Sequence, residues 1–151
     1  MVTNRVLEYL DERNTHYTVT EHRPTFTAQQ TAEVIHVTGQ QMAKPVMVWV
    51  DNKMTMVVVP AQFKINWDSL KEALNAYTIE LAMEGDFRAL FPDCEIGAMP
   101  PFGNLYGIDV IVEASLARDK NISFNAGTHN RSIRMAYKDF EEIVNPRVLK
   151  F

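Results

Sequence analysis

The spacing of apolar and polar residues changes from a helical to a strand period along the first part of the chain. Residues 3–13 place apolar side chains at helical spacing behind Thr3, a candidate N-cap. Residues 16–21 then alternate as strands do, and we expect this strand at the edge of a sheet. Thr27 is positioned to cap a second helix that reaches about residue 36.

Two continuous apolar runs, residues 46–50 and 54–59, flank the polar residues 51–53. This pattern predicts a hairpin of two central strands, because neither face of either strand is polar. Further strands are expected near residues 108–113, 122–125 and 132–135, and further helices at residues 67–77, 84–90 and 137–144. We therefore predict one α/β domain over residues 1–151, with a mixed, mostly antiparallel or barrel-like sheet surrounded by helices.

Composition and charge narrow the possible partners. The chain has 151 residues, 46% of them hydrophobic, which is enough to bury one core. Its net charge is −4 and its fifteen basic residues are scattered, so an RNA contact would be small. No apolar stretch is long enough to span a membrane, and the single cysteine excludes an internal disulfide framework. We expect a cytoplasmic protein with no membrane partner.

Lys44 opens an otherwise apolar strand and is followed by Pro45. A proline belongs at the beginning of a central strand, so Lys44 is expected at the rim of the sheet. An ammonium group beside an apolar interior could orient a carbonyl, carboxylate or phosphate. The alternative is a lysine whose charged end simply extends into water.

A second candidate is the loop of residues 97–103, which contains two glycines and two prolines. Gly97 permits close backbone approach, whereas Pro100 and Pro101 fix torsions, so the remaining N–H groups point in set directions. Such a loop could hold an ester carbonyl or a terminal ribose, or it could be a rigid connection only. His129 lies in a turn between two predicted strands, where it could reach across a pocket mouth or be solvated.

Several common catalytic motifs are absent from the sequence. It has no Gly-x-Ser-x-Gly elbow, Walker loop, dinucleotide glycine motif or His-Glu-x-x-His. The histidines have no ligand-like spacing, so we expect no metal and no other cofactor. Cys94 is expected to be a small buried apolar residue more than a nucleophile, because no histidine is its sequence neighbour.

The order of these segments resembles the YbaK and prolyl-tRNA-synthetase-associated family of editing domains over nearly the whole chain. The matching pieces are His22-Arg23-Pro24 with Thr27-Ala28, the strand that carries Lys44, residues 55–60, residues 96–103, and Phe124-Asn125-Ala126-Gly127 leading to Ile133-Arg134-Met135. The piece around Gly97 to Gly103 is the most specific. The other pieces are weak alone, and it is their shared order that carries the resemblance.

The resemblance implies a site built from a lysine equivalent to Lys44 and a Gly-x-x-x-Pro loop equivalent to residues 97–101. Family members generally lack a protein nucleophile or metal and are thought to use a hydroxyl of the substrate's terminal ribose. The catalytic residues would then be Lys44, Gly97 and Pro101. The substrate-binding residues would be Thr25, Phe26, Met47, Phe102 and His129.

One departure from the family pattern is Pro45, because many relatives carry Asn, Ser or Thr after the lysine. A hydrogen-bonding side chain is lost there, which would alter the amino-acid preference or reduce activity. The implied function is a stand-alone deacylase that removes a small mischarged amino acid, alanine first and serine or threonine next, from tRNA. The expected partners are the acceptor end of an aminoacylated tRNA and an aminoacyl-tRNA synthetase, and a monomer suffices.

Two other functions remain open from the sequence. The domain could bind tRNA or a synthetase without hydrolysis, or it could be an esterase for small molecules without RNA. Salt would separate the esterase from the tRNA enzyme, because phosphate contacts weaken as ionic strength rises.

Overall fold

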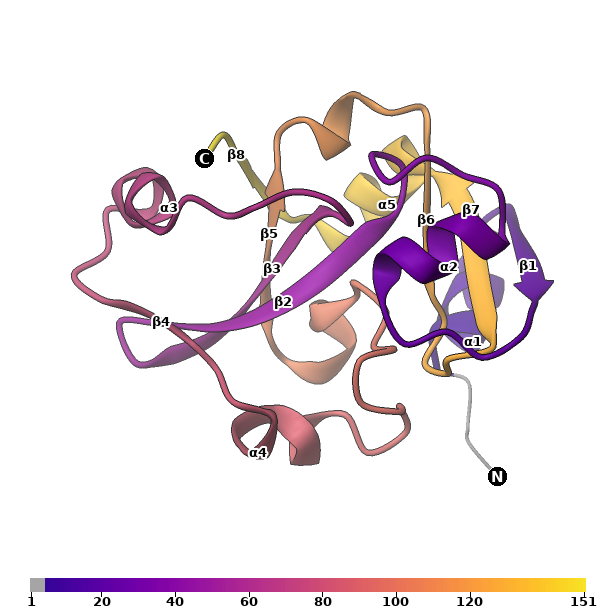
Figure 1. Ribbon diagram of the computed structural model, residues 1–151, viewed down its shortest axis with the longest axis horizontal. Coiled ribbons are helices and arrows are strands. Elements are labelled where there is room, and N and C mark those ends of the chain that lie inside the picture. Colours follow the sequence, from indigo (N-terminus) through magenta and orange to yellow (C-terminus); the bar gives the residue numbers. More distant parts are fainter. Residues whose placement is uncertain (1–4) are drawn as a thin grey trace.

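The computed structural model describes residues 5–151 and confirms an α/β fold (Figure 1). Its strands form two sheets where a single mixed sheet was expected. A three-stranded sheet has the order β1-β7-β6, and a five-stranded sheet has the order β4-β2-β3-β5-β8. The strands are β1 (Tyr17–Glu21), β2 (Ala43–Val50), β3 (Lys53–Pro60), β4 (Ile79–Leu81), β5 (Asp109–Glu113), β6 (Asn121–Asn125), β7 (Arg131–Ala136) and β8 (Arg147–Leu149).

The α-helices surround these sheets. They are α1 (Arg5–Glu12), α2 (Ala28–Val34), α3 (Trp67–Leu74), α4 (Glu84–Phe87) and α5 (Tyr137–Val144). The Thr27 side chain accepts a hydrogen bond from Gln30 N, which confirms it as the cap of α2. The proposed cap at Thr3 lies outside the described residues. Two helices end earlier than predicted, because His36 and Asn75 take left-handed conformations with φ of 60° and 52°.

The predicted hairpin of β2 and β3 is confirmed, and both strands are central in the large sheet. Its turn is only two residues long, since Lys53 already belongs to β3. Asp51 and Asn52 both have positive φ, 48° and 65°, as a two-residue type I′ turn requires. Asp51 Oδ1 also accepts hydrogen bonds from Tyr77 N and Thr78 N, which fixes the turn to the segment before β4.

The large sheet is mixed. β2 pairs antiparallel with β3 and β4, whereas β5 pairs parallel with both β3 and β8. The small sheet is antiparallel throughout, and β1 lies at its edge as predicted. A parallel bridge between Met42 and Ser123 joins the start of β2 to β6. The two sheets therefore meet where the Lys44 strand begins.

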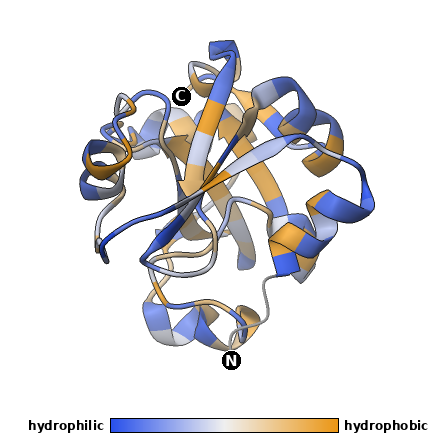
Figure 2. Ribbon diagram, turned by 90° about the vertical axis from the view of Figure 1, so that its right-hand side faces the viewer, coloured by the Kyte–Doolittle hydropathy of each residue, from blue (hydrophilic) through white to orange (hydrophobic). Residues whose placement is uncertain are grey.

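Most of the core fills the space between the two sheets, and its centre is aromatic. Phe102, Phe124 and Phe140 have no exposed surface, and the Phe102 ring lies 5.4 Å and 5.3 Å from the other two ring centroids. The other face of the large sheet packs Val48, Val57 and Val59 against Leu70 of α3. Figure 2 accordingly shows hydrophobic strands at the centre and helices of mixed colour around them. Within residues 5–151, no helix has the length and hydropathy needed to cross a bilayer.

We predict that Phe140→Ala lowers the free energy of unfolding by about 3–5 kcal/mol, because it leaves a cavity beneath α5. Tyr77→Ala is the control, since Tyr77 is 87% exposed and should change stability by about 0.5 kcal/mol or less. Urea denaturation of both variants measures the difference. Equal stabilities would contradict the assignment of Phe140 to the core.

Candidate functional site

Three segments that are far apart in the sequence meet at one end of the small sheet. They are residues 22–27 before α2, residues 95–98, and the turn of residues 126–130 between β6 and β7. Glu95 N donates to Gly127 O, and Gly127 N donates to Ala98 O, both at 2.8 Å. His22 N and Thr25 N donate to Asn130 O and His129 O, each at 2.9 Å. The turn is therefore held on both sides by backbone hydrogen bonds.

His129 joins the three segments. Its backbone N donates to Glu95 Oε1 at 2.8 Å, and its ring Nε2 lies 2.9 Å from Ile96 O. A carbonyl oxygen can only accept, so Nε2 carries the proton of that bond. Ring Nδ1 is buried and has no partner within the described part of the chain. The ring also stacks on Phe26 at a centroid distance of 5.1 Å.

A short series of polar contacts leads from His129 into the protein. Thr25 is 3% exposed, and its Oγ1 donates to His129 O at 3.3 Å. Thr31 is fully buried, and its Oγ1 lies 2.6 Å from Thr25 Oγ1 and 3.4 Å from Asn125 Oδ1. Thr31 belongs to α2, which packs against β6 (Figure 1). These contacts fix the start of α2 relative to the His129 turn.

Gly97 occupies the surface of this cluster and has φ of +88°, a conformation that favours glycine. A Cβ added there would lie 3.4 Å from His129 Cε1, so the ring and the loop are in close contact. Within residues 5–151, the Gly97 N–H donates to no protein acceptor. This exposed N–H is available to a ligand.

The rest of the loop is anchored in the protein. Ala98, Met99, Pro100, Pro101 and Phe102 are all buried. The stiffness expected from the two prolines stays a prediction, and the burial of these residues is consistent with it. Phe102 is fully buried in the core, and Met47 is 3% exposed on the core side of β2. The structure therefore does not bring these two predicted wall residues to the surface of the cluster.

Lys44 is half-buried near the start of β2, as expected for the rim of the sheet. It pairs with Val59, and residues paired across strands share a face, so its side chain lies on the face away from Met47. Lys44 and Asn125 each lie two residues beyond the parallel bridge between Met42 and Ser123. The Lys44 side chain makes no hydrogen bond or ion pair within the described residues.

Cys94 lies behind the loop, in a cluster that supports it. Its Sγ is 3.4 Å from Tyr106 Oη, which donates to Asp93 Oδ2 at 3.0 Å. Arg5 lies 3.8 Å from the same carboxylate oxygen and 4.8 Å from the Tyr106 ring centroid. Burial raises the pKa of the Cys94 thiol to about 11, although the Tyr106 hydrogen bond lowers it. A protonated thiol is a poor nucleophile.

The arrangement is suited to binding a polar group. The Ser132 hydroxyl, which lies 2.8 Å from His22 Nε2, is only 1% exposed. The site offers a free backbone N–H at Gly97, an imidazole at His129 and an exposed aromatic ring at Phe26, which is 71% exposed. Among residues 5–151, no three His, Cys, Asp or Glu side chains are grouped so that they could hold a metal ion. Such a site could hold and polarise an ester that is already reactive.

The fold and these converging loops define a small α/β domain that presents a polar cluster at one end of a twisted sheet. A family model described as the aminoacyl-tRNA editing domain matches residues 22–143. The chain therefore belongs to the aminoacyl-tRNA editing domain family, and the expected resemblance is confirmed.

Proline–tRNA ligases are among the relatives. The ligase of Leuconostoc citreum (strain KM20) is 29% identical over 107 residues, which cover 68% of this chain and 18% of the ligase. The ligase of Bacillus cytotoxicus is 26% identical over 89 residues, covering 59% of this chain and 16% of the ligase. The chain thus spans less than a fifth of the length of these relatives.

Solved structures share the fold. The hypothetical protein APE2540 superposes with a TM-score of 0.84 at 21% identity, covering 95% of both chains. A proposed trans-editing enzyme for prolyl tRNA synthetase superposes with a TM-score of 0.83 at 20% identity, covering 97% of this chain and 95% of that one. At these identities the similarity concerns the fold.

Sequence reasoning assigned no role to three residues that build the cluster. Glu95 binds the His129 backbone, and Thr31 and Asn125 continue the polar contacts inward. Thr31 lies four residues after the α2 cap, and Asn125 precedes the Ala126-Gly127 turn. The sequence does offer one signal, because Thr31 is a polar residue on the inner side of a short helix. Its partner Asn125 could not be named without the fold.

We predict that Gly97→Ala lowers the free energy of unfolding by about 1–2 kcal/mol, since its positive φ disfavours a Cβ. Gly85→Ala is the matched control, because a Cβ there meets nothing within 4 Å in helix α4. That variant should be unchanged or more stable by up to about 1 kcal/mol. Urea unfolding of the pair tests this, and equal shifts would show that Gly97 is unconstrained.

Cys94 should react slowly with iodoacetamide in the folded protein at pH 8. Its raised pKa, about 11, leaves roughly a thousandth of the thiol ionised at that pH. The reaction should accelerate as pH rises towards 11, and at pH 8 it should accelerate when urea unfolds the chain. As the only cysteine, Cys94 accounts for all labelling. Fast labelling of the folded protein at pH 7–8 would contradict the buried, protonated thiol.

Proposed function

We propose that this chain is a stand-alone deacylase that hydrolyses the ester between a small, wrongly attached amino acid and tRNA. The observation that carries this proposal is the family match over residues 22–143, which includes every predicted site residue. The converging loops, with a free N–H at Gly97, are consistent with it. Deacylation in trans is supported by the structural similarity to a proposed trans-editing enzyme for prolyl tRNA synthetase.

In the proposed reaction, water attacks the carbonyl carbon of the aminoacyl ester. Negative charge develops on the carbonyl oxygen, and the Gly97 N–H donates a hydrogen bond to it. The bond from the carbonyl carbon to the ribose oxygen then breaks, and the ribose oxygen takes the proton that water loses. The products are the free amino acid and the uncharged tRNA. A ribose hydroxyl of the substrate assists the water, so no protein nucleophile takes part.

Lys44 orients the substrate in this proposal. Its ammonium group has no partner within residues 5–151 and lies on the same face of β2 as Met42, next to the residues that contact α2. A substrate phosphate or ribose that reaches this face would meet an unpaired charge in a half-buried position. His129 and Phe26 border the opposite, Gly97 side of the site. The substrate would bridge the two sides.

The close contact between Gly97 and the His129 ring favours a small amino acid. A Cβ at Gly97 would lie at contact distance, 3.4 Å, from His129 Cε1, so the ring borders the space beside Gly97. Alanine is the first candidate, followed by serine and threonine. A synthetase discriminates poorly against such residues, because one methylene is worth only about 1–3 kcal/mol.

We predict that Lys44→Ala reduces deacylation of the preferred mischarged tRNA by about 100-fold or more, as expected for loss of a charged positioning group. Lys71→Ala is the control, since Lys71 is exposed in the last turn of α3 and should keep full activity. The assay measures amino acid released from tRNAs charged with Ala, Ser, Thr, Cys or Pro. Thermal unfolding verifies that both variants fold.

Unchanged turnover by Lys44→Ala would remove this residue from the mechanism. A wild-type chain that binds tRNA but releases no amino acid from any member of the panel would identify a binding module of the same fold. Activity on small esters that does not respond to salt would indicate an esterase independent of RNA.

A further inference from the structure

One face of the small sheet is polar, as is common for an antiparallel sheet that packs its other face on the core. Thr18 and Ser123 both pair with Arg134, and Thr20 and Asn125 both pair with Ser132. Residues paired across strands share a face, so these residues form two adjacent rows on the same side of the sheet. Ile133, between the rows, points into the core. The two polar rows therefore lie on the side away from the core.

The inner row is connected to the candidate site. Ser132 Oγ is hydrogen bonded to His22 Nε2 at 2.8 Å, and Asn125 Oδ1 contacts Thr31 at 3.4 Å. His22 belongs to one of the segments that converge on His129, and Thr31 lies in α2 directly after that segment. The outer row lies two residues further along β7, which is about 7 Å from the inner row.

Arg134 in the outer row is exposed, and its guanidinium group makes no hydrogen bond or ion pair within residues 5–151. By contrast, Arg131 on the same strand is paired with Glu21 at 3.0 Å. Arg134 lines a cavity of about 490 Å³, together with His16, Tyr17, Thr18, Asn121, Met135, Ala136 and Asp139. Hydroxyl and amide groups of Thr18 and Asn121 thus accompany the free guanidinium, as in many contacts to phosphate oxygens.

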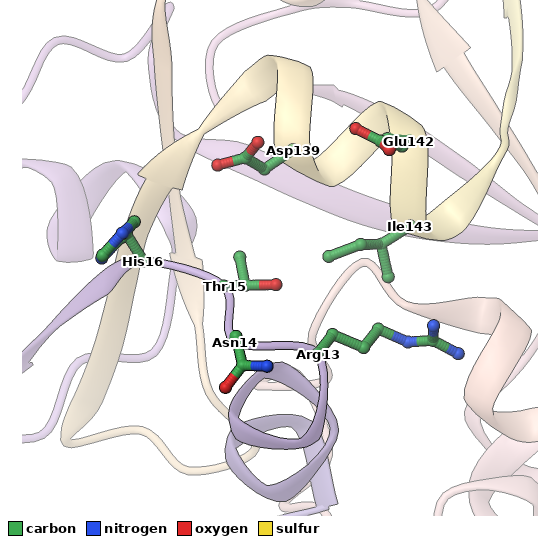
Figure 3. Close-up of a pocket in the computed structure, with 7 residues that line it drawn as sticks. All are labelled: Arg13, Asn14, Thr15, His16, Asp139, Glu142 and Ile143. Atoms are coloured by element: carbon green, nitrogen blue, oxygen red, sulfur yellow. The ribbon is translucent and has the colours of Figure 1, made fainter.

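A neighbouring cavity of about 420 Å³ limits how far this surface extends. Its lining includes Arg13 and His16 but also Asp139 and Glu142 of α5 (Figure 3). Asp139 lines the Arg134 cavity as well, but Glu142 adds a second carboxylate here, so this second cavity is less suited to a phosphate than the first. The contact is confined to the Arg134 row, which agrees with the net charge of −4.

We propose that the Arg134 row binds a backbone phosphate of the RNA near the acceptor end, one or two nucleotides before the terminal ribose. The inference rests on the proposed function and adds a binding contact outside the reacting groups. The Arg134 row lies further along β7 from the His129 turn than the inner row does, as a contact outside the reacting groups requires. Arg is suited to this contact because its planar guanidinium binds two phosphate oxygens at once.

The test compares Arg134→Ala, Arg134→Lys and the control Arg147→Ala on two substrates. Arg147 is exposed on β8, at an edge of the large sheet. For aminoacyl-tRNA, Arg134→Ala should raise KM about tenfold and leave kcat unchanged. For the same amino acid esterified to adenosine, which has no phosphate, it should change nothing. Arg134→Lys should give a smaller increase in KM, and Arg147→Ala should give none.

A binding measurement tests the same contact without catalysis. The probe is an uncharged RNA hairpin with an acceptor stem and a single-stranded 3′ end, titrated at several salt concentrations. Arg134→Ala should reduce the slope of log affinity against log salt by about 0.7–1, the value for one phosphate contact. This measurement remains valid if the wild-type chain proves inactive, so failure of the function and failure of the contact are distinguishable.

Equal loss on both substrates would overturn the proposal, because Arg134 would then act on the reacting groups or on the fold. An unchanged KM for aminoacyl-tRNA, or an unchanged salt slope with the hairpin, would overturn it as well. Thermal unfolding of each variant verifies that the comparison is made on folded protein.

Discussion

The pairing of the Glu95–Ala98 segment with the turn at Gly127 is the interaction on which the candidate site depends. Two backbone hydrogen bonds hold these loops together, and His129 extends the contact to the start of α2. A free N–H at Gly97 has a defined direction only because the loop around it cannot move independently. The burial of Pro100 and Pro101 secures the same loop from the core side. Loops held in this way position a substrate before it reacts, so no further entropy is lost in the transition state.

Most of the helices and strands were predicted from local sequence patterns, because each pattern reflects interactions between residues that are close in the sequence. The cap at Thr27 and the hairpin turn at Asp51 were identified from the sequence, and α5 has the predicted bounds. The short strands β4 and β8 were missed, since three residues carry too little periodicity. The division into two sheets and the parallel pairing of β5 were also missed. Both depend on contacts between distant segments, which no local pattern encodes.

Sequence reasoning also predicted some of the residues of the candidate site, but not all of them. Sequence and family resemblance named Thr25, Gly97 and His129, and the structure brings these together. The same reasoning named Met47 and Phe102, whose large apolar side chains suit a pocket wall and a core equally well. Which face of a strand or loop turns inward depends on register, and a shift of one residue reverses it. The roles of all these residues in catalysis remain predictions.

The bridge between Met42 and Ser123 has a mechanical consequence. Among residues 5–151, it is the single isolated bridge, and Ser123 N donates to Gln41 O beside it at 2.9 Å. Apart from this junction, side chains packed in the core between the sheets, and not a continuous ladder, hold one sheet against the other. Lys44 belongs to one sheet and Asn125 to the other, so a small rotation about the junction would alter the gap between them. A twist about this junction would therefore change the spacing of these two residues without unfolding any strand.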